Sequence, residues 1–165
     1  MEEKLTVIRP TVSSGRAEAI LSGVAGSFVP RFKKLIYYPY LWVHFRYSFE
    51  KLYGNKEFNA FILVDLIRNQ ASTADRFEPV EVEPDGETVL SPDVDEEAAF
   101  KTARTYLLHS TMHHMKVLCE PKATVVQRTV LHKPFHLVEC DHRSKESFHV
   151  VVDALTGKYE ILPER

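Results

Sequence analysis

The most regular pattern in the chain is a two-residue alternation that begins at Leu41. Apolar side chains alternate from there with the polar or aromatic residues Trp42, His44, Arg46 and Ser48. This period is typical of a β-strand that buries one of its faces. The segment Glu57–Ile67 has a similar composition, so the two runs predict an antiparallel hairpin.

Two other stretches have apolar residues at helical spacing. Arg16–Val24 follows a capping serine, Ser13 or Ser14, and Ala98–Lys116 follows a run of acidic residues that suits a helix N-terminus. The remaining strand-like runs are Leu5–Ile8, Ala123–Val130, Phe135–Cys140, Phe148–Ala154 and Lys158–Leu162. The order of helices and strands predicts an α+β fold.

Part of the pattern occurs twice. The run from Lys34 to Val43 matches the run from Thr129 to Val138 at a shift of 95 residues, with a proline, an aromatic residue and a valine in common. A second match, at a shift of 88, places Asp65 over Asp153 and Asn69 over Gly157. Asn and Gly are the residues that best tolerate a left-handed turn position.

The sequence therefore predicts two tandem repeats, each a helix packed on an antiparallel sheet. The first repeat is expected at 1–78 and the second at 95–165, with an acidic, proline-bearing linker at 79–94. In this prediction Pro39, which has no amide donor, marks a strand edge, a bulge or the entry to a strand.

The second repeat resembles the PepSY-like domains, which are small α+β units related in shape to cystatins. The resemblance is carried by a helix, then strands, then the turn Val152-Asp153-Ala154-Leu155-Thr156-Gly157. It implies a helix lying across an antiparallel sheet. It also implies a non-catalytic protein that binds or restrains a partner such as a peptidase.

Charge and composition limit the function classes. The net charge is −2 and the basic residues occur in small interrupted groups, so we expect no nucleic-acid partner. The longest apolar run, Leu35–Val43, is shorter than a membrane-spanning helix requires, and we expect no membrane span. Cys119 and Cys140 have no paired or metal-type spacing, and no signal-peptide pattern follows Met1, so a cytoplasmic location is expected.

The histidines suggest an alternative function. His109 and His113 are four residues apart on the predicted helix, a spacing that can place two imidazoles on one metal ion. The pattern H-E-x-x-H is absent, and no third ligand can be identified. We therefore expect no metal and no cofactor, and we keep a metal-dependent enzyme that uses this helix as the alternative.

Two further groups could carry chemistry but have structural explanations. Cys140 and His136 share a strand face about 13 Å apart, which is too far for a hydrogen bond, so a buried structural thiol is the better interpretation. Asp65 and Asp153 each precede a turn, where Asp accepts backbone amide hydrogen bonds. Neither group predicts catalysis.

Aromatic residues cluster in the strand-like run from Tyr38 to Arg46, and two interpretations of this cluster are open. In one, these residues are core; in the other, an open sheet face presents aromatic residues and arginine to a partner, the composition that interfaces favour. The sequence thus predicts a non-enzymatic protein- or peptide-binding or regulatory module. The predicted contact residues are Tyr38, Tyr40, Trp42, His44 and Arg46.

A homodimer is a third alternative. In it, edge strands flanked by Pro39 pair between two chains.

Overall fold

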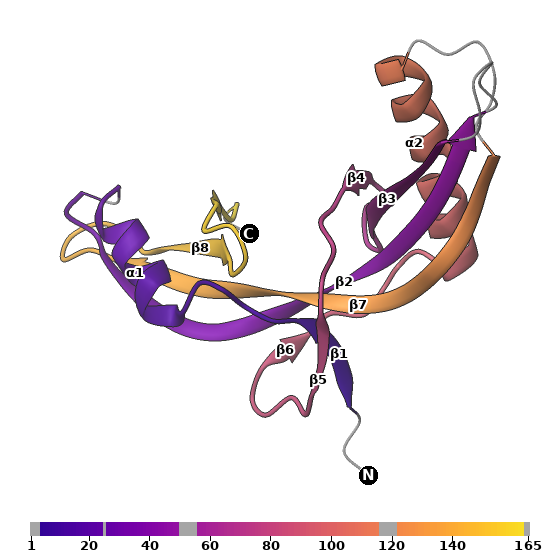
Figure 1. Ribbon diagram of the computed structural model, residues 1–165. Coiled ribbons are helices and arrows are strands. Elements are labelled where there is room, and N and C mark those ends of the chain that lie inside the picture. Colours follow the sequence, from indigo (N-terminus) through magenta and orange to yellow (C-terminus); the bar gives the residue numbers. More distant parts are fainter. Residues whose placement is uncertain (1–3, 25, 50–55, 116–121, 164–165) are drawn as a thin grey trace. The chain divides into compact units, whose positions relative to one another are not determined.

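The computed structural model describes residues 4–24, 26–49, 56–115 and 122–163. Within them the chain forms two helices and nine strands, which confirms the α+β class (Figure 1). The chain divides into two compact units. Unit 1 comprises Met1–Tyr38, Glu78–Leu90 and His132–Arg165, and unit 2 comprises Pro39–Phe77 and Ser91–Leu131.

Two long strands contribute to both units. β2 spans Val29–Phe49, and its first part belongs to unit 1. β7 spans Lys122–Asp141, and its second part belongs to unit 1. The other elements of unit 1 are β1 (Leu5–Ile8), α1 (Ser14–Ser22), β5 (Pro79–Val82), β6 (Thr88–Val89), β8 (Phe148–Asp153) and β9 (Tyr159–Ile161).

The core of unit 1 lies between α1 and the hairpin of β7 and β8. Ser13 caps the helix by accepting a hydrogen bond from the Arg16 amide at 3.1 Å. The apolar side of α1 buries Ala17 and Leu21. They pack on the buried side chains of the hairpin, which are Val138, Cys140, Val150 and Val152.

Unit 2 places α2 (Glu96–Met115) against the rest of β2, β3 (Lys56–Asp65) and β4 (Ala71–Thr73), in the strand order β4-β3-β2-β7. The carboxylate of Asp95 caps α2 by accepting from the Ala98 amide at 2.8 Å. The buried core of this unit is Leu41, Val43, Phe45, Ile62, Val64, Leu66, Ala99, Ala103 and Leu107.

Each unit thus joins a helix from one half of the chain to a hairpin from the other half. α1 precedes β2 in sequence but packs on β7 and β8, whereas α2 precedes β7 but packs on β2 and β3. The compact units therefore cut across the segments 1–78 and 95–165. That the segments 1–78 and 95–165 are two copies of one repeat stays a prediction.

Pro39 in β2 and Pro134 in β7 do not break these long strands. We predicted separate runs on either side of Pro134, but β7 is continuous over 20 residues. The ladder to β8 begins at Phe135, and the ladder from β2 to β3 begins at Tyr40, each one residue after a proline. The missing amide donor therefore falls just before the hairpin ladder starts, where it costs no hydrogen bond of that ladder.

Two further expectations need correction. β2 lies between β3 and β7, so of the positions left open for Pro39 the strand edge is wrong, and a homodimer through edge strands flanked by Pro39 has no such edge to use. Pro39 lies inside β2, directly before the ladder to β3. The segment predicted as a linker contains β5, which pairs with β1, and β6, which pairs with β2. β5 and β6 were missed because they lie in an acidic, proline-bearing segment that has little hydrophobic periodicity.

The two aspartate turns have matching hydrogen bonds. Oδ1 of Asp65 accepts from the amides of Ile67 and Arg68, at 2.8 and 2.9 Å. Oδ1 of Asp153 accepts from Leu155 and Thr156, at 2.8 and 3.3 Å. The left-handed positions also correspond, with φ of 56° at Asn69 and 76° at Gly157.

Replacing Gly157 with Ala tests this turn. We expect the free energy of unfolding to fall by about 1–2 kcal/mol, because a Cβ disfavours the left-handed conformation. That Cβ would also lie 3.2 Å from Cδ1 of Ile20. Asn69→Gly is the matched control and should leave stability within about 1 kcal/mol of the parent, because glycine adopts this conformation without strain. If Gly157→Ala were as stable as the parent in urea unfolding, glycine would not be required at this left-handed position.

Candidate functional site

Three of the predicted contact residues, Trp42, His44 and Arg46, lie on the face of the unit 2 sheet that is opposite α2. Leu41, Val43 and Phe45 face the helix, so the residues between them face away. We call this side the outer face. Its cross-strand pairs are Trp42 with Leu63, His44 with Phe61, and Arg46 with Asn59.

Trp42 is part of the interior of this face. Only 3% of its surface is exposed. Its ring stacks on Phe61 at 5.7 Å and contacts Phe77 at 6.5 Å. Its indole N–H donates to the Asp75 carbonyl at 3.3 Å, so the segment that follows β4 covers the ring. The core interpretation therefore holds for Trp42, and a partner could reach it only if that segment moved.

His44 and Arg46 lie further along the strand and are more accessible. Arg46 and Asn59 are exposed, whereas His44 and Phe61 are half-buried. The His44 ring stacks on Phe61 at 4.4 Å, and its Nε2 lies 2.9 Å from Oδ1 of Asn59. We call these four residues the β2–β3 patch. It combines a cation, an amide, an imidazole and an aromatic ring on neighbouring strands.

The two tyrosines of the predicted site lie elsewhere. Tyr38 belongs to unit 1, where its ring contacts Phe135 edge-on at 6.0 Å. Tyr40 is half-buried and pairs across the strands with Asp65, near the aspartate turn. The structure thus brings together only His44 and Arg46 as accessible members of the predicted set. It adds Asn59 and Phe61, which the sequence analysis missed.

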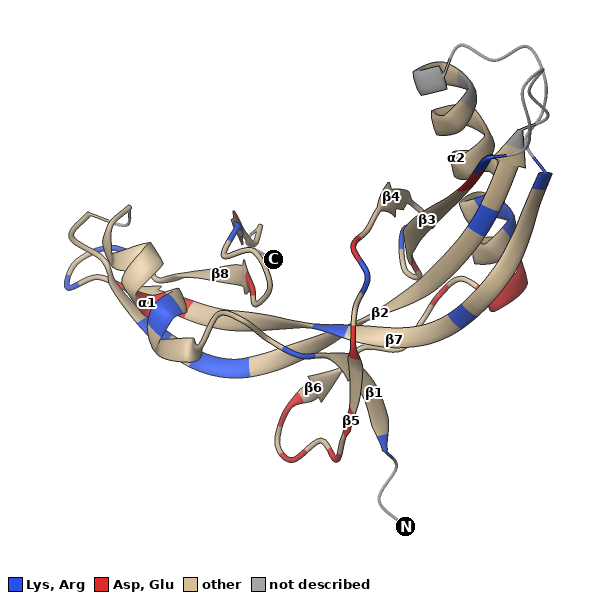
Figure 2. Cartoon of the chain, viewed as in Figure 1, with Lys and Arg blue, Asp and Glu red and all other residues tan. Residues whose placement is uncertain are grey.

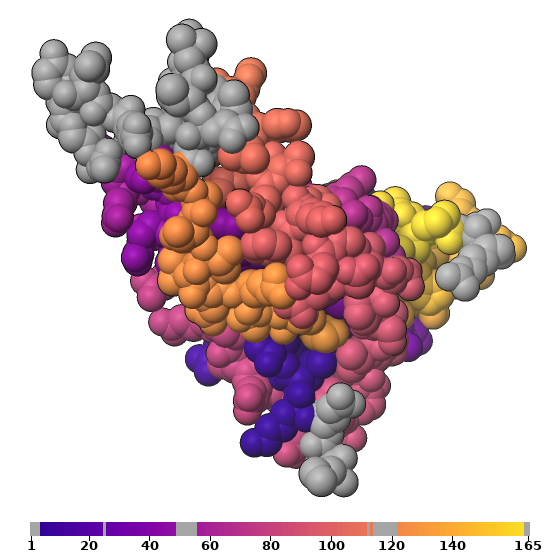
Figure 3. Space-filling view, turned by 90° about the vertical axis from the view of Figure 1, so that its right-hand side faces the viewer, coloured from indigo at the N-terminus to yellow at the C-terminus, as the bar shows by residue number. Residues whose placement is uncertain are grey.

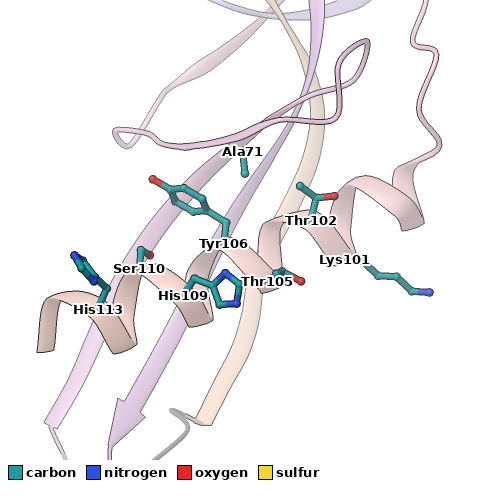
Figure 4. Close-up of a pocket in the computed structure, with 8 residues that line it drawn as sticks. All are labelled: Ala71, Lys101, Thr102, Thr105, Tyr106, His109, Ser110 and His113. Carbon is teal, nitrogen blue, oxygen red and sulfur yellow. The ribbon is translucent and has the colours of Figure 1, made fainter. Parts of the chain in front are cut away.

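An open groove of about 770 Å³ runs along α2, on the side next to β4 (Figure 4). Tyr106 extends from the helix toward β4, and its hydroxyl lies 3.0 Å from Oγ1 of Thr73. His109 and His113 are exposed and line the same groove, but Figure 4 shows their rings directed away from each other. The remaining lining residues are Ala71, Lys101, Thr102, Thr105 and Ser110.

The groove along α2 offers at most two metal ligands, His109 and His113. Among the described residues, no group of three His, Cys, Asp or Glu side chains comes together to hold a metal ion. The lining residues other than the histidines are hydroxyl-bearing, apolar or cationic. The metal-dependent enzyme therefore stays an untested alternative.

Cys140 has the surroundings of a structural thiol. It is fully buried against α1, and burial, followed by the nearby charge of Asp141, raises the pKa of the thiol. A raised pKa lowers the thiolate fraction and with it the reactivity. His136 faces the same core and lies 2.6 Å, through Nε2, from the Val12 carbonyl. Cys119 lies outside the described residues.

Asp153 combines its turn role with an ion pair. Its Oδ2 lies 2.6 Å from Nζ of Lys133, and both side chains are largely buried. The carboxylates of Asp65 and Asp153 are each engaged by backbone amides, as the turn interpretation expects.

Two of the basic residues at the start of β2, Arg31 and Lys33, lie close to acids on β7, and Figure 2 shows both signs of charge there. Arg31 lies 3.4 Å from Asp141, and Lys33 lies 3.7 Å from Glu139. Glu139 also lies 3.3 Å from Nε2 of His149. The neighbouring carboxylates offset this local positive charge, so the stretch adds no argument for a polyanionic ligand.

Among the described residues, no helix is both long and apolar enough to cross a membrane.

No protein-family model, no curated protein and no solved structure matches the chain. The geometry therefore carries the functional argument.

Proposed function

We propose that this chain is a non-enzymatic protein- or peptide-binding module that contacts its partner through the β2–β3 patch. The observation that carries the proposal is the pairing of exposed Arg46 with exposed Asn59 beside the His44–Phe61 stack. A regulatory role, including one on a peptidase, is the form of binding that the PepSY-like resemblance implies.

The chemistry of the patch suits a protein surface. Arginine and aromatic residues are enriched at interfaces, because they combine a large contact area with directional hydrogen bonds. Asn59 offers both a donor and an acceptor, and the arginine offers five donors. The buried Trp42 stacks on Phe61, so the patch is packed against the interior of the outer face.

We also infer that the two halves of the chain are diverged copies of one unit. Three correspondences support this inference, beginning with the two aspartate turns. The carbonyls of Pro39 and Pro134 accept from Leu66 and Ala154 respectively, at 3.1 and 3.2 Å. The capping side chains of α1 and α2, Ser13 and Asp95, each accept a hydrogen bond from the backbone amide three residues later.

The PepSY-like likeness extends this inference. In each unit a helix packs on an antiparallel hairpin that ends in an aspartate turn. The helix comes from the other half of the chain in both units, whereas the resemblance implies α2 on the strands that follow it.

Substitutions in the patch test the binding proposal. We expect Arg46→Glu combined with Asn59→Lys to abolish capture of a partner from the native cell, because both changes reverse or introduce a charge at the contact. The fold should persist, since both side chains are exposed. The measurement is quantitative affinity capture with the parent chain as bait alongside.

Lys101→Glu on α2 is the matched control, because Lys101 is also exposed but lies in the α2 groove. It should capture as much partner as the parent. Equal capture by the parent and the folded double variant would refute the patch as the contact surface.

A further inference from the structure

The first part of β7 forms an edge of the unit 2 sheet. In the order β4-β3-β2-β7, β2 lies on one side of it. The next strand in the sheet, β1, pairs with β7 at Val7 and His132, which is beyond this stretch and in unit 1. We call residues 123–129 the β7 edge. Within the described residues no strand is paired to its outer side.

Among the described residues, both faces of the β7 edge are partly open at its centre. Val125 and Val126 are 42% and 46% exposed. Neighbouring side chains of a strand point to opposite faces of the sheet. Because Val125 and Val126 are both exposed, each face has some open surface here. In Figure 3 the orange atoms of β7 lie uncovered beside the atoms of α2. Large apolar side chains on a surface commonly mark a contact site.

The side chains of the β7 edge do not protect it. Natural edge strands are usually blocked by lysine, proline or a charge that points inward. Residues 123–127 read Ala-Thr-Val-Val-Gln and contain none of these. The charged residues that flank this stretch are Lys122, the first residue of β7, and Arg128, which is held by Glu96 at 3.1 Å and Glu97 at 2.6 Å. The uncharged stretch is therefore open to another strand.

We propose that the β7 edge is a dimerisation surface, on which a second copy of this chain adds its own β7 edge in antiparallel orientation. Two-fold antiparallel pairing centred on Val126 sets Val126 opposite Val126 and Arg128 opposite Thr124, so it opposes no like charges. The small net charge of −2 gives little repulsion between copies. A foreign peptide read by sequence would need side-chain pockets beside the edge. The α2 groove takes none of its residues from the β7 edge.

Sedimentation velocity of the full chain from low micromolar to millimolar concentration tests the proposal. We expect a reversible monomer–dimer equilibrium. Val126→Lys should raise the dissociation constant by at least about tenfold, because the symmetric interface loses a β-branched contact in both copies and gains two charges. A parent chain that stays monomeric throughout would overturn the proposal.

Two controls locate the interface. Val24→Lys adds the same charge at another exposed valine and should leave the dissociation constant unchanged. Ile161→Lys places it on the exposed strand β9 and should also have no effect. A dimer weakened by Ile161→Lys but not by Val126→Lys would assign the interface to β9 instead.

Hydrogen exchange of the parent chain needs no substitution and covers the case in which Val126→Lys does not fold. Amides within residues 124–129 should exchange more slowly when the concentration exceeds the dissociation constant. Unchanged exchange there in a confirmed dimer would overturn the proposal. If the chain is monomeric and these amides exchange more slowly only after another protein is added, the β7 edge binds a foreign strand. That result would also overturn the dimer proposal.

Discussion

Replacing Trp42 with Ala is expected to lower the free energy of unfolding by about 3–5 kcal/mol, the usual cost of truncating a large buried aromatic side chain. The ring is 3% exposed and lies against Phe61 and Phe77, so its removal leaves a cavity on the outer face. It also leaves the Asp75 carbonyl without the indole donor. Urea unfolding followed by circular dichroism measures the loss, since the chain contains a single Trp and the variant has no indole fluorescence.

Arg46→Ala is the matched control, because Arg46 lies on the same strand and the same face but is exposed. Its stability should stay within about 0.5 kcal/mol of the parent. A Trp42→Ala variant as stable as Arg46→Ala would mean that the indole is not part of the core. Trp42 would then return to the list of partner contacts.

Replacing Asp153 with Ala should have an effect of similar size. The carboxylate caps the turn through two amides and pairs with Lys133 at 2.6 Å, with side-chain exposures of 12% for Asp153 and 16% for Lys133. Removing one partner of a buried pair leaves the other charge poorly compensated, which typically costs 3–5 kcal/mol in all (a rough range). Chemical unfolding at neutral pH measures the change.

Glu81→Ala controls for the loss of an ordinary ion pair. Glu81 lies 3.9 Å from Lys4, and both side chains are about two-thirds exposed, at 66% and 63%. Its removal should change stability by no more than about 1 kcal/mol. Equal, small effects of both substitutions would show that the turn and the ion pair of Asp153 contribute little to unit 1.

The helices and most strands were predictable because their information is local. The alternation from Leu41 and the capped, helically spaced run at Ala98 each report a single buried face, and both elements form as expected. The continuity of β7 was not predictable from Pro134 alone. A proline is compatible with a strand when its missing donor lies outside the ladder, and that depends on a partner strand distant in sequence.

The composition of the two units was also beyond the sequence analysis. α1 and the β7–β8 hairpin that it covers are separated by more than a hundred residues, and periodicity does not state which helix covers which sheet.

The candidate site was predicted in part. Alternation placed Trp42, His44 and Arg46 on one face correctly, because the period of a strand is two. Their exposure depends on what covers that face, and the cover on Trp42 comes from Asp75 and Phe77, beyond the hairpin. Asn59 and Phe61 could have been found by pairing the two hairpin strands.

Site-specific photo-crosslinking tests whether the β2–β3 patch contacts a partner protein. A photoreactive phenylalanine analogue is placed at position 46 in one variant and at position 101 in another, and each is irradiated in the native cell. We expect a defined protein adduct from position 46 and none from position 101. An adduct from position 101 alone, or no adduct from position 46 while the chain is folded and abundant, would contradict it.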